Sequence, residues 1–120
     1  DRMVMADIDG LLEKAEGFAG QQRWNEAAIT ARQAVEAAPE NRRAKDKLGW
    51  YLSRAEEYAD AIEVYALLVL DAPDNPKYPY MLGYQYYAQQ NYESAIPWFR
   101  KSLELKPDYL VVLYRCGYAQ

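Results

Sequence analysis

The chain has 120 residues, about half of them apolar and about a quarter charged, and its formal net charge is −4. This length suits one globular domain, and the interspersed charges argue against nucleic acid or an anionic membrane as the main partner. A single cysteine and no histidine exclude an internal disulfide and the metal sites built from these two residue types, so we expect neither metal nor cofactor.

The sequence predicts consecutive units of two short helices. The first unit, residues 8–41, is the least regular. In residues 42–75, "RRAKDKLGWYLSRA" and "YADAIEVYALLVL" place apolar residues three and four apart, and in residues 76–109 "YPYMLGYQYYAQQ" and "YESAIPWFRKSLEL" do the same. This spacing is typical of one face of an α-helix, whereas the alternation of a strand is not sustained. Residues 110–120 begin a partial fourth unit.

A constant interval, which we call the repeat interval, separates Pro39 from Pro73 and Pro73 from Pro107. A proline closes each second helix because it lacks an amide donor and disfavours helical geometry before it, and the asparagine that often follows can cap the next helix. Pro97 lies inside the last helix, where we expect a mild kink or a late start. The other residues that keep the repeat interval are Ala27, Ala61 and Ala95; Trp24, Tyr58 and Tyr92; Leu48 and Leu82; and Gly49, Gly83 and Gly117. Such periodicity indicates a repeat architecture.

Small residues recur where the two helices of a unit should cross. Gly49 and Gly83 lie on the first helices and Ala61 and Ala95 on the second, and their lack of bulk allows a close approach. Aromatic rings at helical spacing should fill the core around them. The rings predicted for the core are Tyr58, Tyr65, Tyr86, Tyr92 and Phe99.

These features resemble the tetratricopeptide repeat family, with its pattern W-x2-L-G-x2-Y, A-x3-F, P. The residues that match in the third unit are Leu82, Gly83, Tyr86, Ala95, Phe99 and Pro107, with Pro79 at the tryptophan place. Those of the second unit are Leu48, Gly49, Leu52, Ala61, Tyr65 and Pro73, with Lys45 at the tryptophan place. The first unit departs from the pattern, as terminal repeats often do, and holds Lys14, Ala15, Phe18, Ala27, Ala31 and Pro39 at these places.

The resemblance implies an all-α, right-handed superhelical solenoid of antiparallel helix hairpins, with about three repeats and one extra helix in a single array over residues 1–120. In this family the first helix of each unit lines a concave groove. The residues placed on or beside that groove are Arg43, Asp46, Lys47, Trp50, Ser53, Arg54, Lys77, Tyr80, Tyr84, Tyr87, Tyr114 and Tyr118. All of these except Asp46, Ser53 and Arg54 are our candidate peptide-binding residues. Exposed aromatic side chains commonly mark a contact surface.

The expected function is therefore that of a protein-protein interaction scaffold, which binds an extended or helical peptide in an aromatic-lined concave groove. The alternatives are a structural or regulatory repeat segment of a larger protein, or a secretion-type chaperone. We expect no enzyme activity and no catalytic residue, because no nucleophile, paired-carboxylate or phosphate-binding constellation rises above ordinary surface charge. The core-register residues Leu110, Leu113 and Cys116 would lack a covering helix, so we expect end-to-end self-association.

One known family site is tested directly by the sequence. Repeats that bind the acidic C-terminal tails of heat-shock chaperones use a clamp of lysine, asparagine and arginine at fixed groove places. Of the residues at those places only Lys77 matches, and Glu16 would repel a carboxylate, although Arg43, Lys47 and Lys77 could attract a mildly acidic segment. The residues at the clamp places are Leu12, Glu16, Lys47, Lys77 and Met81. We therefore expect no such clamp.

No apolar run approaches the roughly 18–20 residues that cross a bilayer, and the segment "DRMVMADIDG" lacks the apolar core of a signal peptide. We accordingly expect no direct membrane insertion and favour a cytoplasmic location. Because the sequence begins with Asp1 rather than methionine, we expect it to be a piece of a longer chain.

Overall fold

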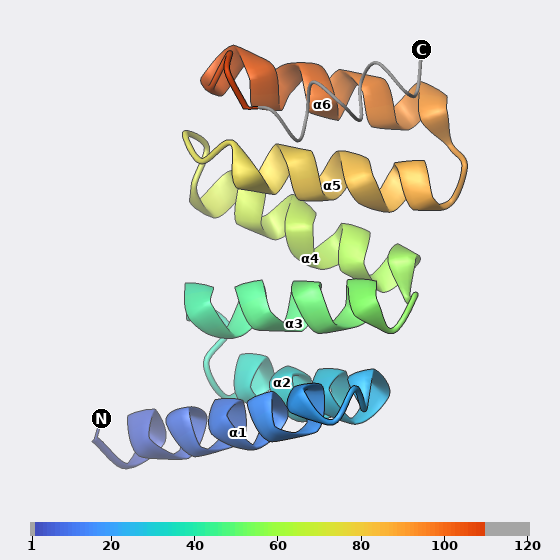
Figure 1. Ribbon diagram of the computed structural model, residues 1–120. Coiled ribbons are helices and arrows are strands. Elements are labelled where there is room, and N and C mark those ends of the chain that lie inside the picture. The colour runs from blue at the N-terminus through green and yellow to red at the C-terminus, as the bar shows by residue number, and fades with distance from the viewer. Residues whose placement is uncertain (1, 110–120) are drawn as a thin grey trace. The chain divides into compact units, whose positions relative to one another are not determined.

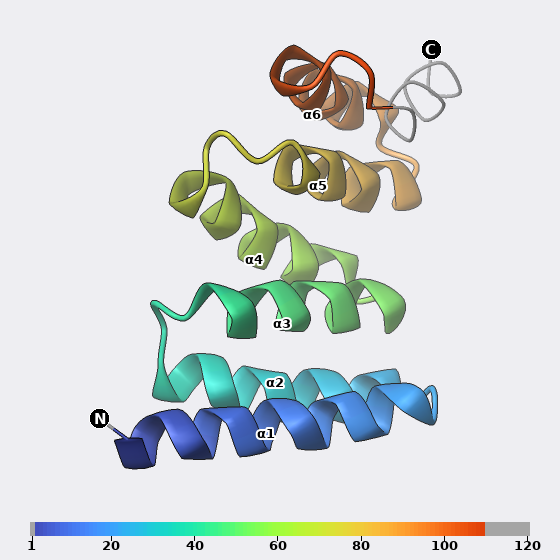
Figure 2. The same ribbon diagram turned by 60° about the vertical axis from the view of Figure 1, so that its left-hand side comes forward.

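The computed structural model describes residues 2–109, which form six α-helices and no strand (Figure 1 and Figure 2). The helices are α1 (Arg2–Gly20), α2 (Trp24–Ala37), α3 (Arg42–Arg54), α4 (Tyr58–Asp71), α5 (Lys77–Ala88) and α6 (Tyr92–Leu105). The predicted all-α fold is confirmed. The predicted start of a fourth unit, residues 110–120, lies outside the described residues.

The repeat interval is present in the backbone as well as in the side chains. Each turn within a helix pair contains one residue with a left-handed backbone: Gln22 (φ 59°), Glu56 (φ 63°) and Gln90 (φ 63°). The next amide donates to the carbonyl oxygen five residues earlier, which is the closing bond of a Schellman turn. These bonds are Arg23 to Phe18 (2.9 Å), Glu57 to Leu52 (2.8 Å) and Asn91 to Tyr86 (2.9 Å). Three turns thus share one geometry without a glycine to mark it.

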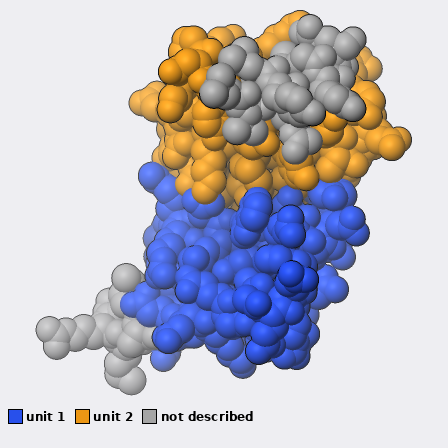
Figure 3. Space-filling view, in the orientation of Figure 1, with its two compact units in different colours: residues 1–60 blue, residues 61–120 orange. Residues whose placement is uncertain are grey.

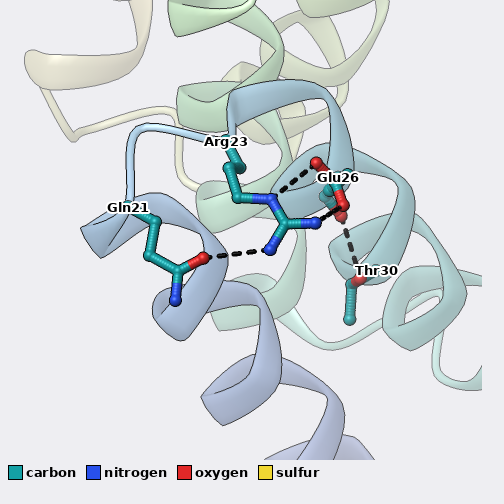
Figure 4. Close-up of polar contacts among 4 residues, drawn as sticks. All are labelled: Gln21, Arg23, Glu26 and Thr30. Atoms are coloured by element: carbon teal, nitrogen blue, oxygen red, sulfur yellow. Dashed lines mark hydrogen bonds and ion pairs between the residues drawn. The ribbon is translucent and has the colours of Figure 1, made fainter.

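Arg23 holds the first of these turns through its side chain (Figure 4). Its guanidinium donates to both carboxylate oxygens of Glu26, at 2.8 Å through Nε, and to Oε1 of Gln21 at 3.0 Å. It also lies 4.8 Å from the ring centre of Phe18. The Thr30 hydroxyl donates to the backbone oxygen of Glu26 at 2.9 Å. Because the ion pair is exposed, it stabilises the turn by under about 1 kcal/mol.

Asparagine side chains cap two helices, and the sequence predicts the first of these caps, at Asn41. Asn41 Oδ1 accepts from the amide of Ala44 at 3.0 Å, and Asn91 Oδ1 accepts from the amide of Ser94 at 3.3 Å. Each bond satisfies an amide that the first helical turn leaves without a partner. The late start considered for α6 is wrong, since α6 begins ahead of Pro97 and continues through it. A helix of 14 residues thus tolerates the loss of one backbone bond.

The chain divides into two compact units, residues Asp1–Asp60 and Ala61–Gln120 (Figure 3). In the first unit, α2 packs against both α1 and α3. A core cluster of this unit consists of Ile8, Leu12, Ala34, Ala38 and Ala44. In the second unit, α5 packs against α6. The single array with repeat boundaries near residues 41 and 75 stays a prediction.

The core between α5 and α6 is built around Phe99, which is fully buried together with Ala95. A Cβ atom on Gly83 would lie 2.7 Å from Cδ1 and Cε1 of the Phe99 ring and 3.1 Å from the backbone oxygen of Ala95. Real Cβ atoms do not approach other atoms so closely, and any larger side chain would force the helices apart. The predicted close crossing at Gly83 and Ala95 is therefore confirmed.

Three of the rings predicted for the core lie nearer the surface. Tyr65 and Phe99 are fully buried as expected, but Tyr92 is 42 % exposed, and Tyr58 and Tyr86 are half-buried. Tyr58 and Tyr92 are the first residues of α4 and α6, at the end of a helix pair, where less of the partner helix covers a side chain. The repeat register therefore identified the helix face correctly but overestimated how deeply these three side chains are buried.

Candidate functional site

The tyrosine row of the second unit consists of Tyr80, Tyr84 and Tyr87 on α5. Spacings of four and three residues place them along one face of the helix, and all three are half-buried. Tyr80 is central: its ring centre lies 6.4 Å from that of Tyr84 and 5.9 Å from that of Phe99, and a T-shaped contact joins it to Tyr109 at 5.8 Å. These distances are those of favourable aromatic pairs.

The tyrosine row belongs partly to the core. Tyr80 and Tyr87 both pack against the Ala95–Phe99 cluster, as does Tyr86. The ring of Tyr87 is 6.4 Å from Phe99 and 5.4 Å from Tyr92. The sequence assigned Tyr86 and Tyr92 to the core and the row to the surface, whereas the structure forms one continuous set of rings. Its deep end supports the fold, and its outer edge reaches the surface.

A second aromatic group lies in the first unit around Arg54. The guanidinium of Arg54 is 4.9 Å from the ring centre of Trp24 and 5.8 Å from that of Trp50. Trp24 also contacts Tyr51, with ring centres 6.3 Å apart. Trp50 remains 46 % exposed. The Arg54 guanidinium is within reach of a cation–π contact with both indole rings, so this group offers a mixed aromatic and cationic surface.

Sequence reasoning missed part of this group. It used Trp24 only as a repeat match, because a tryptophan at the start of a second helix gave no signal that it would meet Arg54 from α3. The two residues are far apart in the sequence and on different helices, so only the packing of α2 on α3 brings them together. Ser53, placed on or beside the groove from the sequence, is buried, with 6 % of its surface exposed.

The candidate cations of α3 are engaged by carboxylates of α1. Lys47 Nζ lies 2.6 Å from Glu16 Oε1, and Arg43 lies 3.7 Å from the same oxygen and 3.4 Å from Asp9 Oδ1. The hydrogen bond and charge of Lys47, with a smaller contribution from Arg43, hold the pKa of Glu16 below its ordinary value. Burial raises the pKa of the Tyr51 hydroxyl, which lies on α3 with Arg43 and Lys47. Two of the candidate cations, Arg43 and Lys47, are thus paired with carboxylates of the same unit.

The remaining candidates differ in position. Lys77, the first residue of α5, is exposed, and its Nζ lies 5.8 Å from the ring centre of Tyr78. Tyr114 and Tyr118 lie outside the described residues, as do Leu110, Leu113 and Cys116, on which the expected self-association depends.

Within residues 2–109 no group of three or more acidic or cysteine side chains is arranged to hold a metal ion. In the same part of the chain, no helix combines the length and the apolar character that crossing a bilayer requires. What the described surface offers is contact area, from aromatic rings and paired charges.

Comparison with protein families matches the tetratricopeptide repeat over residues 12–79 and again over residues 47–109. No curated protein matches the chain. Among solved structures, the first tetratricopeptide repeat domain of Spaghetti (RPAP3), bound to the HSP90 peptide SRMEEVD, is similar with a TM-score of 0.84 and 21 % identity; the match covers 95 % of this chain and 90 % of that one.

Two further structures have the same fold. The Arabidopsis OM64 tetratricopeptide repeat domain has a TM-score of 0.86 at 17 % identity, with 98 % of this chain and 97 % of that one covered. MamA from Desulfovibrio magneticus RS-1 has a TM-score of 0.87 at 21 % identity, with 94 % and 64 % covered. These structures share the helix arrangement, and the family match covers well over half of the sequence. The chain therefore belongs to the tetratricopeptide repeat family.

Proposed function

We propose that the chain is a protein-interaction module that holds a peptide segment against the aromatic side chains of α5. The observation that carries the proposal is the tyrosine row, which presents three half-buried rings along one face of α5. Tyrosine offers a large and stiff contact area at low cost in side-chain entropy, and tandem repeats generally use their surfaces for binding. The similar domain of Spaghetti, with its bound peptide, supports this class of function.

The partner should be rich in apolar or aromatic side chains rather than an acidic tail. At the places of the two-carboxylate clamp, Leu12 and Met81 are buried, and Glu16 is paired with Lys47. An incoming carboxylate would have to displace Glu16, which has the same charge and is already positioned. Because a rim charge pair contributes under about 1 kcal/mol and an aromatic anchor about 2 kcal/mol or more, the rings should dominate the affinity.

Tyr84 is the residue to change first, since Tyr80 and Tyr87 also pack against Phe99 and their loss would disturb the core. Peptides selected on the full chain from a random library provide the probes, and calorimetry gives their dissociation constants. We expect Tyr84→Ala to weaken binding by about 30-fold, which corresponds to roughly 2 kcal/mol, with unchanged helicity. Trp98→Ala is the control, because Trp98 is also a half-buried aromatic but lies on α6.

Salt provides a second readout. An aromatic contact should show a shallow dependence of affinity on ionic strength, whereas recognition led by Arg43, Lys47 and Lys77 should weaken steeply as charges are screened. Equal affinities for Tyr84→Ala and the parent chain would remove the row from the binding surface. A structural role within a larger protein would then be the better account.

A further inference from the structure

The outer face of α4 carries large apolar side chains in water. Leu70 is 77 % exposed and Leu67 53 %, and Ala66 beside them is also exposed. Leu67 and Leu70 are three residues apart, so their side chains are neighbours on one face of the helix. We call Ala66, Leu67 and Leu70 the α4 leucine face. Neighbouring exposed leucines of this kind mark a contact surface more often than single ones do.

The same repeat places are polar in the other two second helices. One repeat interval before Leu67 and Leu70, the chain has Gln33 and Glu36 on α2, and both are exposed. One repeat interval after them, it has Lys101 and Glu104 on α6, which form an ion pair at 3.8 Å. The fold therefore does not require leucine at these places, and the residues at the corresponding places of α2 and α6 are polar. The repeat fold therefore does not explain why leucine occupies these two exposed positions of α4.

Acidic residues flank the α4 leucine face at both ends. Glu63 is exposed one turn before Leu67, and Asp71 and Asp74 are exposed after Leu70. The 14 residues of α4 contain three acidic side chains and no lysine or arginine. Two copies of this face would bring like charges together, and an anionic membrane would be repelled. Charge complementarity therefore favours a basic occupant.

From this arrangement we infer that the α4 leucine face docks an amphipathic helix of another protein, whose apolar side chains recur three and four residues apart between lysine or arginine residues. The apolar stripe covers Leu67 and Leu70, and the flanking cations lie against Glu63 and Asp74. An amphipathic helix is the common peptide element that presents apolar side chains at this spacing. The surface is distinct from the tyrosine row and does not depend on the function proposed for it.

The test uses two synthetic helical peptides of alanine and leucine with one apolar stripe, one flanked by lysines and the other by glutamates. Each is titrated into the full chain, with backbone amide chemical shifts as the readout. We expect the lysine peptide to shift the signals of α4, and the glutamate peptide to bind about tenfold more weakly or worse. The double variant Leu67→Gln, Leu70→Gln, which removes both apolar side chains without adding charge, should weaken the lysine peptide by about tenfold or more.

Ile29→Gln is the matched control, because Ile29 is a 61 % exposed aliphatic residue on α2 and its loss should leave peptide binding unchanged. Circular dichroism checks that the variants fold, and Leu70→Gln alone replaces the double variant if that one does not. A peptide concentration of about 1 mM detects even weak binding. The inference is overturned if the lysine peptide does not shift the α4 signals at that concentration, or if it binds the leucine variant as tightly as the parent chain. The inference would also be overturned if the parent chain forms a dimer that the leucine variant abolishes. The same holds if the parent chain binds anionic vesicles and the leucine variant does not.

Discussion

The contact between Gly83 and Phe99 sets how closely α5 and α6 approach, and it gives a prediction whose magnitude follows from the geometry. At an open helical site, replacing glycine by alanine stabilises a protein by about 0.5–1 kcal/mol. At Gly83 the new Cβ would lie 2.7 Å from two ring atoms of Phe99, whereas carbon atoms are normally about 3.5–4.0 Å apart. The ring would have to move by about 1 Å, yet it is fully buried and in contact with Tyr80 and Tyr87.

Overpacking of this kind costs about 1–3 kcal/mol. We therefore expect Gly83→Ala to destabilise the chain by about 1 kcal/mol after its gain in helix propensity, and Gly83→Leu by about 3 kcal/mol. For a chain of this length each kcal/mol lowers the melting temperature by roughly 3–6 °C. Thermal unfolding followed by far-UV circular dichroism measures the change, and near-UV circular dichroism reports whether the rings have repacked.

Gly10→Ala is the matched control, since Gly10 lies within α1 and a Cβ there meets no atom within 4 Å. It should raise the melting temperature by a few degrees, because only the helix propensity changes. The sign of the two alanine variants is the decisive result. If Gly83→Ala stabilises the chain as Gly10→Ala does, the close crossing of α5 and α6 is wrong.

Two further predictions concern a turn and an ion pair. Gln90→Gly should raise the urea midpoint by an amount equivalent to about 0.5–1 kcal/mol, because glycine adopts the left-handed backbone of Gln90 without strain; a lower midpoint would contradict that geometry. Glu16→Gln should reduce the loss of stability in acid. Because folding lowers the pKa of Glu16, its carboxylate adds to the free energy of unfolding above the unfolded-state pKa, and this addition is lost as pH falls through the folded-state pKa. Because this pair is exposed, the effect is under about 1 kcal/mol, and identical acid unfolding of both chains would exclude it.

The features that the sequence predicted correctly are those that each unit must satisfy by itself. Gly83 and Ala95 are small because two helices cross there, and Asn41 caps a helix because the first amides need an acceptor. Phe99 is buried because a large ring fills the space that the small residues leave. Each requirement acts through a local spacing or through the repeat interval, so a single sequence reveals it.

The features that the sequence did not reveal depend on what a neighbouring helix contributes. Tyr92 keeps the spacing of a core residue, but it begins α6 and remains 42 % exposed. The sequence predicted that cations of α3 contribute to a binding surface, but Lys47 forms an ion pair with Glu16 on α1. The left-handed turn at Gln90 carries neither glycine nor asparagine, which are the usual signals for that backbone.

The difference between α4 and its two counterparts shows how repeats separate fold from function. Where two helices of a unit cross, each position requires a residue of a particular size. Substitutions there are restricted because a change of size would disrupt the crossing. At an outward place the fold imposes little, since exposed substitutions change stability by about 0.5 kcal/mol or less. Leucines at the outward places Leu67 and Leu70, where the other units have polar residues, therefore carry information that packing cannot supply. The same reasoning separates Tyr84 from Phe99: α5 and α6 need the buried ring of Phe99, whereas the half-buried ring of Tyr84 is the one that we propose contacts a partner.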